Sequence, residues 1–396
     1  MVTTKVVPTI YFDNAATSWP KPPAVSAAVS EYLTDAGGNP GRSGHRMSVA
    51  AARVVEDARE TLAELFNVSD PSRLVFTHNA THALNLALYG LLRRGDHVVT
   101  TSVEHNSVMR PLRHLETLGV ELTVVSCTPE GTLDPDAVER AMRPATRLLV
   151  ATHGSNVVGT VMPIAALAAL AQTHHVPFLV DASQTAGAIP IDVQETDIGL
   201  LAFTGHKGLL GPPGTGGLYI REDIELAPLI RGGTGSDSAH DVQPEFLPDM
   251  HESGTLNVAG IAGLAAGVRF LLDVGVGAVQ ARERALVARF LDAAAGIAGL
   301  VVYGPRDVSQ RCGVVSFNVA GAMSSEVGLI LDQSFAVMAR TGLHCAPSAH
   351  HTLGTFPAGT VRFGFGWFNT EAEVDAALEA LGAIAVWGAK GVAWTA

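Results

Sequence analysis

Apolar and polar residues alternate between two periodicities from about residue 20 to residue 250. One pattern repeats apolar side chains at helical spacing, and the other consists of short β-branched runs. Strands that alternate with helices in this way indicate a mostly parallel sheet with helices on both faces. The predicted helices cover residues 24–33, 48–66, 83–92, 108–118, 134–142 and 164–173, and the predicted strands cover residues 73–77, 97–101, 121–126, 147–152, 177–180, 198–203 and 217–220.

The alternation stops at residues 231–257, which are predicted to form a long loop, and long loops in compact domains are often functional. Helices are expected over 258–274 and 277–295, followed by the order strand, strand, helix, strand, helix. We therefore predict an α/β protein with a seven-stranded, mostly parallel large domain and a smaller α+β domain. The expected boundaries are 20–258 for the large domain, and 1–19 with 259–396 for the small one.

Composition narrows the possible classes. Of the 396 residues, 47% are apolar and 16% are charged, which excludes a disordered chain. The net charge of -12 disfavours nucleic acid as a partner, although a small anion can still bind to local dipoles. Three cysteines suit a reducing compartment. No apolar run is long enough for a secretory leader or a membrane span, so we expect a soluble, cytoplasmic protein without a membrane partner.

Five polar clusters follow predicted strands of the large domain. Ligands of open parallel sheets bind outside the carboxyl ends of the strands, so these clusters can meet at one edge. One of them, Asn79-Ala80-Thr81, can be either a plain helix cap or an anion site made of backbone N–H groups. The other side chains that can converge there are His105, Asn156, Asp181, Gln184, His206 and Lys207.

Lys207 follows a predicted strand and precedes a glycine-rich segment. A solvated loop lysine is the ordinary interpretation of such a position. Asp181 at the end of another strand favours a different one, because a Schiff-base lysine and an acid for a pyridinium nitrogen serve pyridoxal 5'-phosphate (PLP). The pairs His174-His175 and His350-His351 lack a cysteine or carboxylate at zinc-like spacing, and no metal is expected there.

The motifs Asp181-Ala-Ser-Gln184 and Thr204-Gly-His-Lys207 resemble those of the class V aminotransferase family of fold type I PLP enzymes. Residues 340–347, Arg-Thr-Gly-Leu-His-Cys-Ala-Pro, resemble the active-site cysteine motif of the cysteine desulfurases, in the group with the SUF-type enzymes and selenocysteine lyases. The similarity extends from Tyr11 to Asn369 and so covers nearly the whole chain.

The resemblance implies a role for each matching residue. Lys207 would hold PLP and move protons at the substrate Cα, while Asp181 would pair with the pyridine nitrogen and His105 would stack on the ring. Arg362 would clamp the substrate carboxylate, the geometry that arginine favours. Thr255 would reach the phosphate of a neighbouring subunit, which implies a homodimer. The other implied contacts are Ala80, Thr81, Thr204 and His206 to the phosphate, Gln184 to the phenolic oxygen, and Asn156 and Arg340 to the substrate.

Cys345 would carry the specific chemistry. Its neighbours Gly342, His344 and Pro347 suggest a loop, and the nearby histidines could favour the thiolate. Cys127 and Cys312 are expected to be packing residues. The implied reaction converts L-cysteine to L-alanine and leaves a persulfide on Cys345 for an acceptor protein or small thiol. Three alternatives stay open: selenocysteine lysis, C–S elimination or another class V PLP reaction, and a non-catalytic sulfur-relay scaffold.

Overall fold

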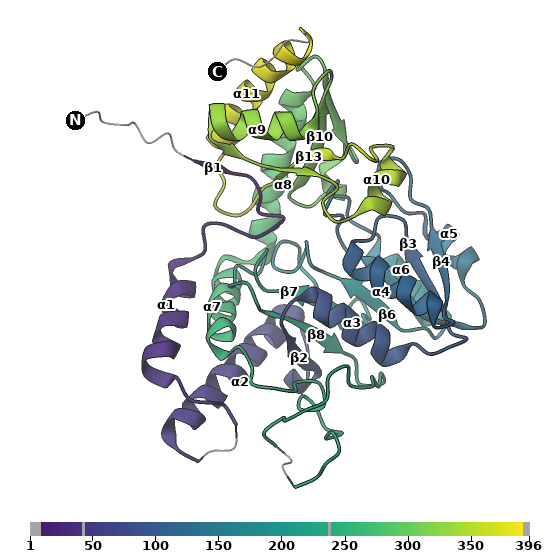
Figure 1. The fold of residues 1–396 in the computed structure, drawn as a ribbon, viewed down its shortest axis with the longest axis vertical. Helices are drawn as coiled ribbons and strands as arrows, with labels where there is room; N and C mark the ends of the chain where they lie inside the picture. The colour runs from purple at the N-terminus through teal and green to yellow at the C-terminus, as the bar shows by residue number, and fades with distance from the viewer. Residues whose placement is uncertain (1–8, 42–43, 237–238, 391–396) are drawn as a thin grey trace.

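A computed structural model describes residues 9–41, 44–236 and 239–390, and it contains three sheets (Figure 1). The largest has seven strands in the order β2-β8-β7-β6-β5-β3-β4. Their bounds are β2 (Leu74–Thr77), β3 (His97–Thr101), β4 (Glu121–Val125), β5 (Thr146–Thr152), β6 (Phe178–Asp181), β7 (Leu200–Thr204) and β8 (Gly216–Ile220).

The predicted sheet is confirmed as mostly parallel. The neighbours from β7 through β6, β5 and β3 to β4 are parallel, whereas β8 runs antiparallel to both β7 and β2. The segment between β7 and β8 is short and contains no helix, and only a crossover connection can return a chain to a parallel strand. The reversal at β8 therefore follows from the length of this connection.

Alternate residues of the central strands pack on opposite faces of the sheet. Leu149 and Leu201 belong to one apolar cluster, and their neighbours Leu148 and Leu200 belong to another. Both faces are therefore covered, as is usual for parallel strands. The helices around the sheet are α1 (Pro23–Glu31), α2 (Arg46–Phe66), α3 (Ala80–Leu91), α4 (Asn106–Thr117), α5 (Pro135–Ala141), α6 (Ile164–Thr173) and α7 (Val258–Val274).

A smaller unit is built on the antiparallel sheet β12-β13-β10-β9. Its core is aromatic: the ring centroids of Phe317 and Phe363 lie 4.8 Å apart, and Phe290 and Phe12 pack beside them. The N-terminal strand β1 (Ile10–Tyr11) joins this unit by pairing with β11. The remaining elements are α8 (Val276–Ala294), β9 (Leu300–Tyr303), β10 (Val314–Val319), α9 (Ser324–Phe335), β11 (Val337–Met338), β12 (Arg340–Gly342), α10 (Pro347–Leu353), β13 (Thr360–Gly364) and α11 (Glu371–Gly388).

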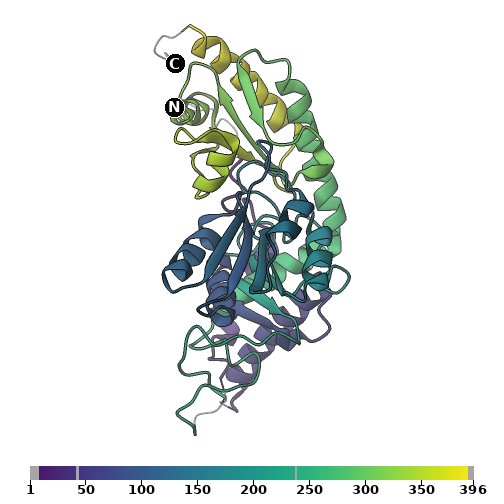
Figure 2. The same ribbon diagram turned by 90° about the vertical axis from the view of Figure 1, so that its right-hand side faces the viewer.

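Helices α7 and α8 connect the two units along one side of the molecule (Figure 2). They meet at a bend of 82°, and no single helix of the described residues has the length and apolar composition to cross a membrane. Buried α7 residues such as Leu264 and Val268 belong to the large apolar cluster, whereas Phe290 of α8 belongs to that of the small unit. The predicted domain boundary between residues 258 and 259 stays a prediction. It assigns α7 to the small domain, whereas the apolar contacts of α7 are with the large unit.

The long loop before α7 is held by a buried ion pair. Arg59 Nη1 and Nη2 donate to the two carboxylate oxygens of Glu252 at 2.8 and 3.0 Å. Glu252 also accepts from the backbone N–H of Phe76 at 2.6 Å, and the Arg59 guanidinium lies 4.7 Å from the Phe76 ring centroid. These contacts fix the end of the loop against α2 and β2.

Breaking this pair from one side should destabilise the fold. In Glu252→Gln the buried guanidinium of Arg59 keeps only the exposed carboxylate of Glu56, 3.8 Å from its Nε, as a counter-charge. We expect a loss of about 3–5 kcal/mol in the free energy of unfolding. The double variant Arg59→Met/Glu252→Leu should cost less, because no charge remains buried. Glu116→Gln, which breaks an exposed ion pair with Arg113, is the control and should cost about 1 kcal/mol or less. Equal losses in the single and double variants by denaturant unfolding would contradict this account.

Candidate active site

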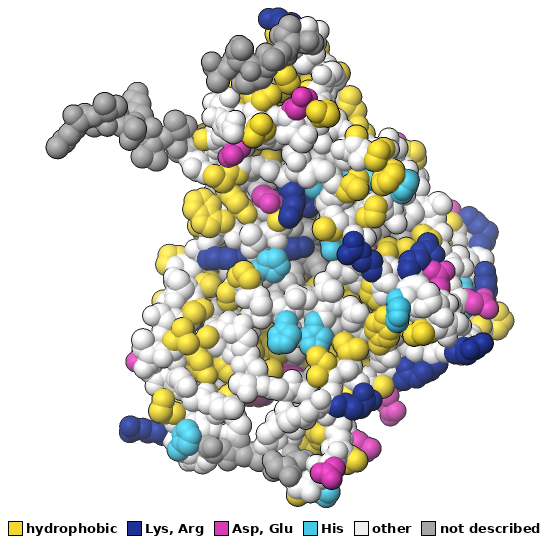
Figure 3. Space-filling view, in the orientation of Figure 1, with side chains coloured by type: hydrophobic (Ala, Val, Ile, Leu, Met, Phe, Trp, Pro, Cys, Tyr) yellow, Lys and Arg dark blue, Asp and Glu magenta, His cyan; other side chains and the backbone are white. Residues whose placement is uncertain are grey.

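The clusters at the carboxyl ends of the strands meet at a cavity of about 320 Å³. On the face drawn in Figure 3, Lys, Arg and His side chains gather at the level where the small unit meets the large one. All predicted site residues except Thr255 line this cavity: Ala80, Thr81, His105, Asn156, Asp181, Gln184, Thr204, His206, Lys207, Arg340, Cys345 and Arg362.

Lys207 and Asp181 form the charged centre of the cavity. Asp181 is the last residue of β6, is 3% exposed, and accepts hydrogen bonds from the backbone N–H and hydroxyl of Ser183. Burial lowers the pKa of Lys207 to about 8, although the negative charge of Asp181 opposes the shift. Near neutral pH, Lys207 is thus closer to its neutral, nucleophilic form than an ordinary lysine.

His105 is a neutral ring beside this pair. Its Nδ1 accepts from the backbone N–H of Ser107 at 3.0 Å, which makes His105 the N-cap of α4. Burial lowers the pKa of His105 to about 4, assisted by the charges of Lys207 and Arg362 and opposed by Asp181. The accepting Nδ1 fixes the tautomer of the uncharged ring, and the cap fixes its position.

The start of α3 provides a site with anion-binding character. Asn79 Oδ1 accepts from His82 N at 3.0 Å, so Asn79 is a helix cap, as one of the two interpretations required. The first N–H groups of any helix lack intrahelical acceptors, and those of Ala80 and Thr81 lie at the cavity. Thr204 Oγ1 is buried without a hydrogen-bond partner in the described part of the chain. An anion at this position would satisfy these donors.

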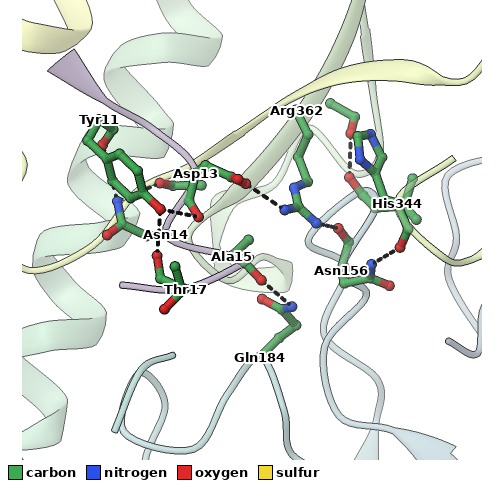
Figure 4. A network of polar contacts seen from close by, with 12 residues as sticks. Tyr11, Asp13, Asn14, Ala15, Thr17, Asn156, Gln184, His344 and Arg362 are labelled. Carbon is green, nitrogen blue, oxygen red and sulfur yellow. Dashed lines mark hydrogen bonds and ion pairs between the residues drawn. The ribbon is translucent and has the colours of Figure 1, made fainter. Parts of the chain in front are cut away.

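Arg362 of the small unit connects its own strand to the N-terminal segment and to the chain after β5 in the large unit (Figure 4). It lies on β13, is 2% exposed, and donates through Nη2 to Asp13 Oδ1 and through Nη1 to the backbone oxygen of Asn156, each at 2.9 Å. Its Nε is buried and has no partner among the described residues. A carboxylate entering the cavity would meet a buried guanidinium that is already held in place.

Cys345 lies in a turn between β12 and α10. It is exposed, whereas Cys127 and Cys312 are buried, as expected for packing residues. His344 and Cys345 both have left-handed backbone conformations, with φ of 48° and 57°. Such conformations cost about 1 kcal/mol or more each for residues other than glycine, so the turn needs contacts that hold it.

The expectation that histidines favour the Cys345 thiolate is wrong for the two nearest ones. Burial lowers the pKa of His344 to about 2 and that of His350 to about 4, and the charge of Arg362 further lowers that of His344. Both rings are therefore neutral near pH 7. Arg340 and Arg362 are the permanent cations on the cavity wall beside Cys345.

Two further predicted residues, Gln184 and Thr255, differ in their position relative to the cavity. Gln184 lines the cavity, and its Nε2 donates to the backbone oxygen of Ala15 at 3.0 Å. Thr255 is exposed and lies outside this cavity, so its predicted contact depends on a second subunit and stays a prediction. Within the described residues there is no group of three or more His, Cys, Asp or Glu side chains that could hold a metal ion.

Sequence reasoning missed Asp13 and Glu104. Asp13 is the ion-pair partner of Arg362, and only the quoted motif around Tyr11 could have drawn attention to it. Glu104 accepts from Thr101 Oγ1 at 2.6 Å and from Thr152 N at 3.0 Å, which ties β3 to β5 next to His105. Burial raises the pKa of Glu104 to about 8, so it is mostly protonated at neutral pH.

Comparison with known proteins supports the same interpretation. Residues 10–377 match the family model described as aminotransferase class-V. A probable cysteine desulfurase of Methanothermobacter thermautotrophicus is 36% identical over 95% of this chain and 94% of its own length. A cysteine desulfurase of Haloferax volcanii is 34% identical over 95% of this chain and 89% of its own.

The fold agrees with these similarities. The apo structure of a cysteine desulfurase from Thermococcus onnurineus superposes with a TM-score of 0.89 at 35% sequence identity, and the match covers 96% of this chain and 95% of that one. Both the sequence and the fold are thus matched over almost the full length. The chain belongs to the class V aminotransferase family, in the group whose curated members are named cysteine desulfurases.

Proposed function

We propose that this protein is a PLP-dependent cysteine desulfurase that converts L-cysteine to L-alanine and takes up the sulfur as a persulfide on Cys345. The observation that carries the proposal is that one cavity is lined by the partly buried Lys207, the buried Asp181 and the exposed thiol of Cys345. The first two suit PLP chemistry, and the third is a nucleophile that a simple aminotransferase would not need.

The cavity fits PLP. A partly buried lysine with a lowered pKa lines the same cavity as a buried carboxylate, and the first N–H groups of α3 and the unpaired Thr204 Oγ1 suit a phosphate. Lys207 would hold the aldehyde carbon, Asp181 the ring nitrogen, and the neutral ring of His105 would stack on the cofactor. Ala80, Thr81, Thr204 and His206 would hold the phosphate, and Gln184 the phenolic oxygen. When bound, PLP supplies an electron sink for negative charge at the substrate Cα.

Arg362 and Asn156 are proposed to bind the substrate carboxylate, with Arg340 at the same wall. Arg362 has an unpaired buried Nε and is kept in place by Asp13. A bidentate carboxylate is the usual partner of such a guanidinium. With the substrate fixed in this way, Lys207 would remove and return protons at Cα.

Cys345 accepts the sulfur. The bond between the substrate Cβ and its sulfur breaks, a bond forms between that sulfur and Cys345 Sγ, and Cβ takes up a proton to become the methyl group of alanine. One L-cysteine and one Cys345 thiol thus give one L-alanine and one persulfide, without an external oxidant or reductant. Since Cys345 is exposed, an acceptor protein or small thiol can then remove the outer sulfur directly.

Selenocysteine lysis and C–S elimination remain alternatives at the same site, and their products distinguish them: elimination gives pyruvate and ammonia in place of alanine. A sulfur-relay scaffold without catalysis would show no lysine-bound cofactor.

The free cysteines suit our expectation of a reducing cytoplasm.

A homodimer is part of the proposal. Thr255 is exposed and follows Glu252, which the Arg59 ion pair fixes against the fold. An exposed hydroxyl three residues beyond this fixed position can contact the phosphate in a second subunit. In a mixed dimer of Thr255→Ala and Lys207→Ala subunits, the one site that keeps Lys207 would receive the unaltered Thr255 of the other subunit. We expect full PLP retention at that one site, but weakened retention at the one Lys207 site of a mixed dimer of wild type with the double variant Thr255→Ala/Lys207→Ala, measured by dialysis and absorbance.

Replacing Cys345 tests the sulfur step. Cys345→Ser should abolish the formation of alanine and sulfide from L-cysteine in the presence of a reductant, because the hydroxyl cannot accept the sulfur. Cys127→Ala removes a buried thiol away from the cavity and should retain the rate. The persulfide mechanism is wrong if Cys345→Ser makes alanine at the wild-type rate.

The pH dependence of Lys207 tests the electrostatics of the site. In protein freed of PLP, the rate of acylation of Lys207 should be half-maximal near pH 8 instead of near the ordinary pKa of 10.5, since only the neutral amine reacts. Asp181→Asn should lower this midpoint, because the lost negative charge had favoured the protonated form. Arg362→Gln should raise it. A wild-type midpoint near 10, read by mass spectrometry of the labelled peptide, would contradict the burial of this amine.

A further inference from the structure

Asn156 connects the wall that faces the substrate carboxylate to the segment that carries the nucleophile. Its side-chain Nδ2 donates to the backbone oxygen of His344 at 2.7 Å, next to Cys345. Its own backbone oxygen accepts from Arg362 Nη1 at 2.9 Å. Figure 4 shows Arg362, Asn156 and His344 in this continuous series of contacts.

The Asn156 amide has the capacity for two partners. A carboxamide carries two N–H donors, and one of them is used on the His344 oxygen. The side chain lines the cavity although the residue is only 8% exposed. A ligand carboxylate can therefore take the second N–H without displacing the first hydrogen bond.

The Cys345 turn depends on such hydrogen bonds because its backbone is strained. His344 and Cys345 are consecutive left-handed residues, a conformation disfavoured for side chains with a Cβ. The turn is also held by Asn106 N, which donates to the Cys345 oxygen at 2.8 Å, and by the His344 ring, whose Nε2 lies 3.0 Å from Thr360 Oγ1. Of the residues that hold the turn from outside it, Asn156 lines the cavity, whereas Asn106 and Thr360 do not.

We infer that Asn156 is a positioning residue for the sulfur-transfer step, which it serves by holding the substrate carboxylate and the Cys345 turn with one amide group. This rests on the proposed function for the identity of the ligand. Because both hydrogen bonds start from the same nitrogen, binding of the carboxylate and placement of Cys345 share one fixed reference point. The substrate sulfur and the accepting thiol of Cys345 are thereby placed within reach of each other.

The kinetic test separates positioning from binding. If Asn156 only binds the carboxylate, Asn156→Ala raises KM and leaves the rate of persulfide formation at saturating L-cysteine unchanged. If Asn156 also positions Cys345, the single-turnover rate at saturation falls as well, by roughly tenfold to a hundredfold, since misplacing reactants by about 1 Å costs that much. Asn156→Asp keeps the shape but lacks both N–H donors, and it should show the same loss at saturation.

A second readout needs no turnover. In the PLP-loaded enzyme without substrate, Asn156→Ala should speed backbone hydrogen exchange in the peptide 339–353, where Ala346 N donates to the Leu343 oxygen at 2.9 Å. L-Alanine, which supplies the carboxylate without a sulfur, should slow exchange of this peptide in the wild type but not in the variant. Asn67→Gly removes an amide hydrogen bond to Asp192 away from the cavity and should leave the exchange of 339–353 unchanged.

The two readouts give distinct outcomes. Faster exchange together with a lower saturated rate supports the positioning role. The positioning role is wrong if hydrogen exchange of the peptide 339–353 is unchanged in Asn156→Ala, or if the saturated rate of that variant equals the wild-type rate. If the wild type forms no alanine from L-cysteine, the proposed function fails, and the exchange measurement without ligand still decides whether Asn156 holds the Cys345 turn.

Discussion

The arrangement of the site depends on a guanidinium that is charged and almost completely buried. Arg362 is 2% exposed, and burying such a charge without partners would cost several kcal/mol. Asp13 offsets this cost from the N-terminal segment, and the Asn156 oxygen does so from the end of the β5 region. The small sheet is thus attached to the large one at the point where a substrate carboxylate has to bind.

Burial also sets the protonation states of the ionisable side chains that line the cavity. Lys207, His105 and His344 all have lowered pKa values with burial as the main cause, and Arg362 adds to each shift. The result is a neutral or readily deprotonated amine, a neutral ring beside it and a neutral histidine before Cys345. Asp181 and the two arginines carry the fixed charges, and this separation of roles is what proton transfer at Cα and carboxylate binding require.

Much of the large unit could be predicted because buried parallel strands leave an unmistakable pattern. Strand β3 and helices α6 and α7 have the predicted bounds, and other elements of the large unit differ by a few residues at their ends. The reversed direction of β8 was not predicted, because an apolar run of five residues carries no information about strand direction. Strands β11 and β12 and the seven-residue helix α10 were missed, since they are too short to show a period.

The site residues were predicted from motifs, whereas their interactions required the fold. Asp13 and Arg362 are separated by 349 positions, and no local pattern links them. The neutral state of His344 and His350 follows from burial, which the sequence Leu343-His344-Cys345 does not reveal. The proposed positioning role of Asn156 depends on the hydrogen bond from its amide to the backbone oxygen of His344, which no sequence motif indicates.

The transfer of the substrate sulfur to Cys345 as L-alanine forms is the step on which the proposed function depends. It is tested most directly by mass spectrometry of the PLP-loaded protein after brief exposure to L-cysteine without reductant, with the released alanine measured in the same sample. The peptide containing Cys345 should gain the mass of one sulfur atom, in equal amount to the alanine. Alanine without that added mass, or the added mass on Cys127 or Cys312 instead, would contradict it.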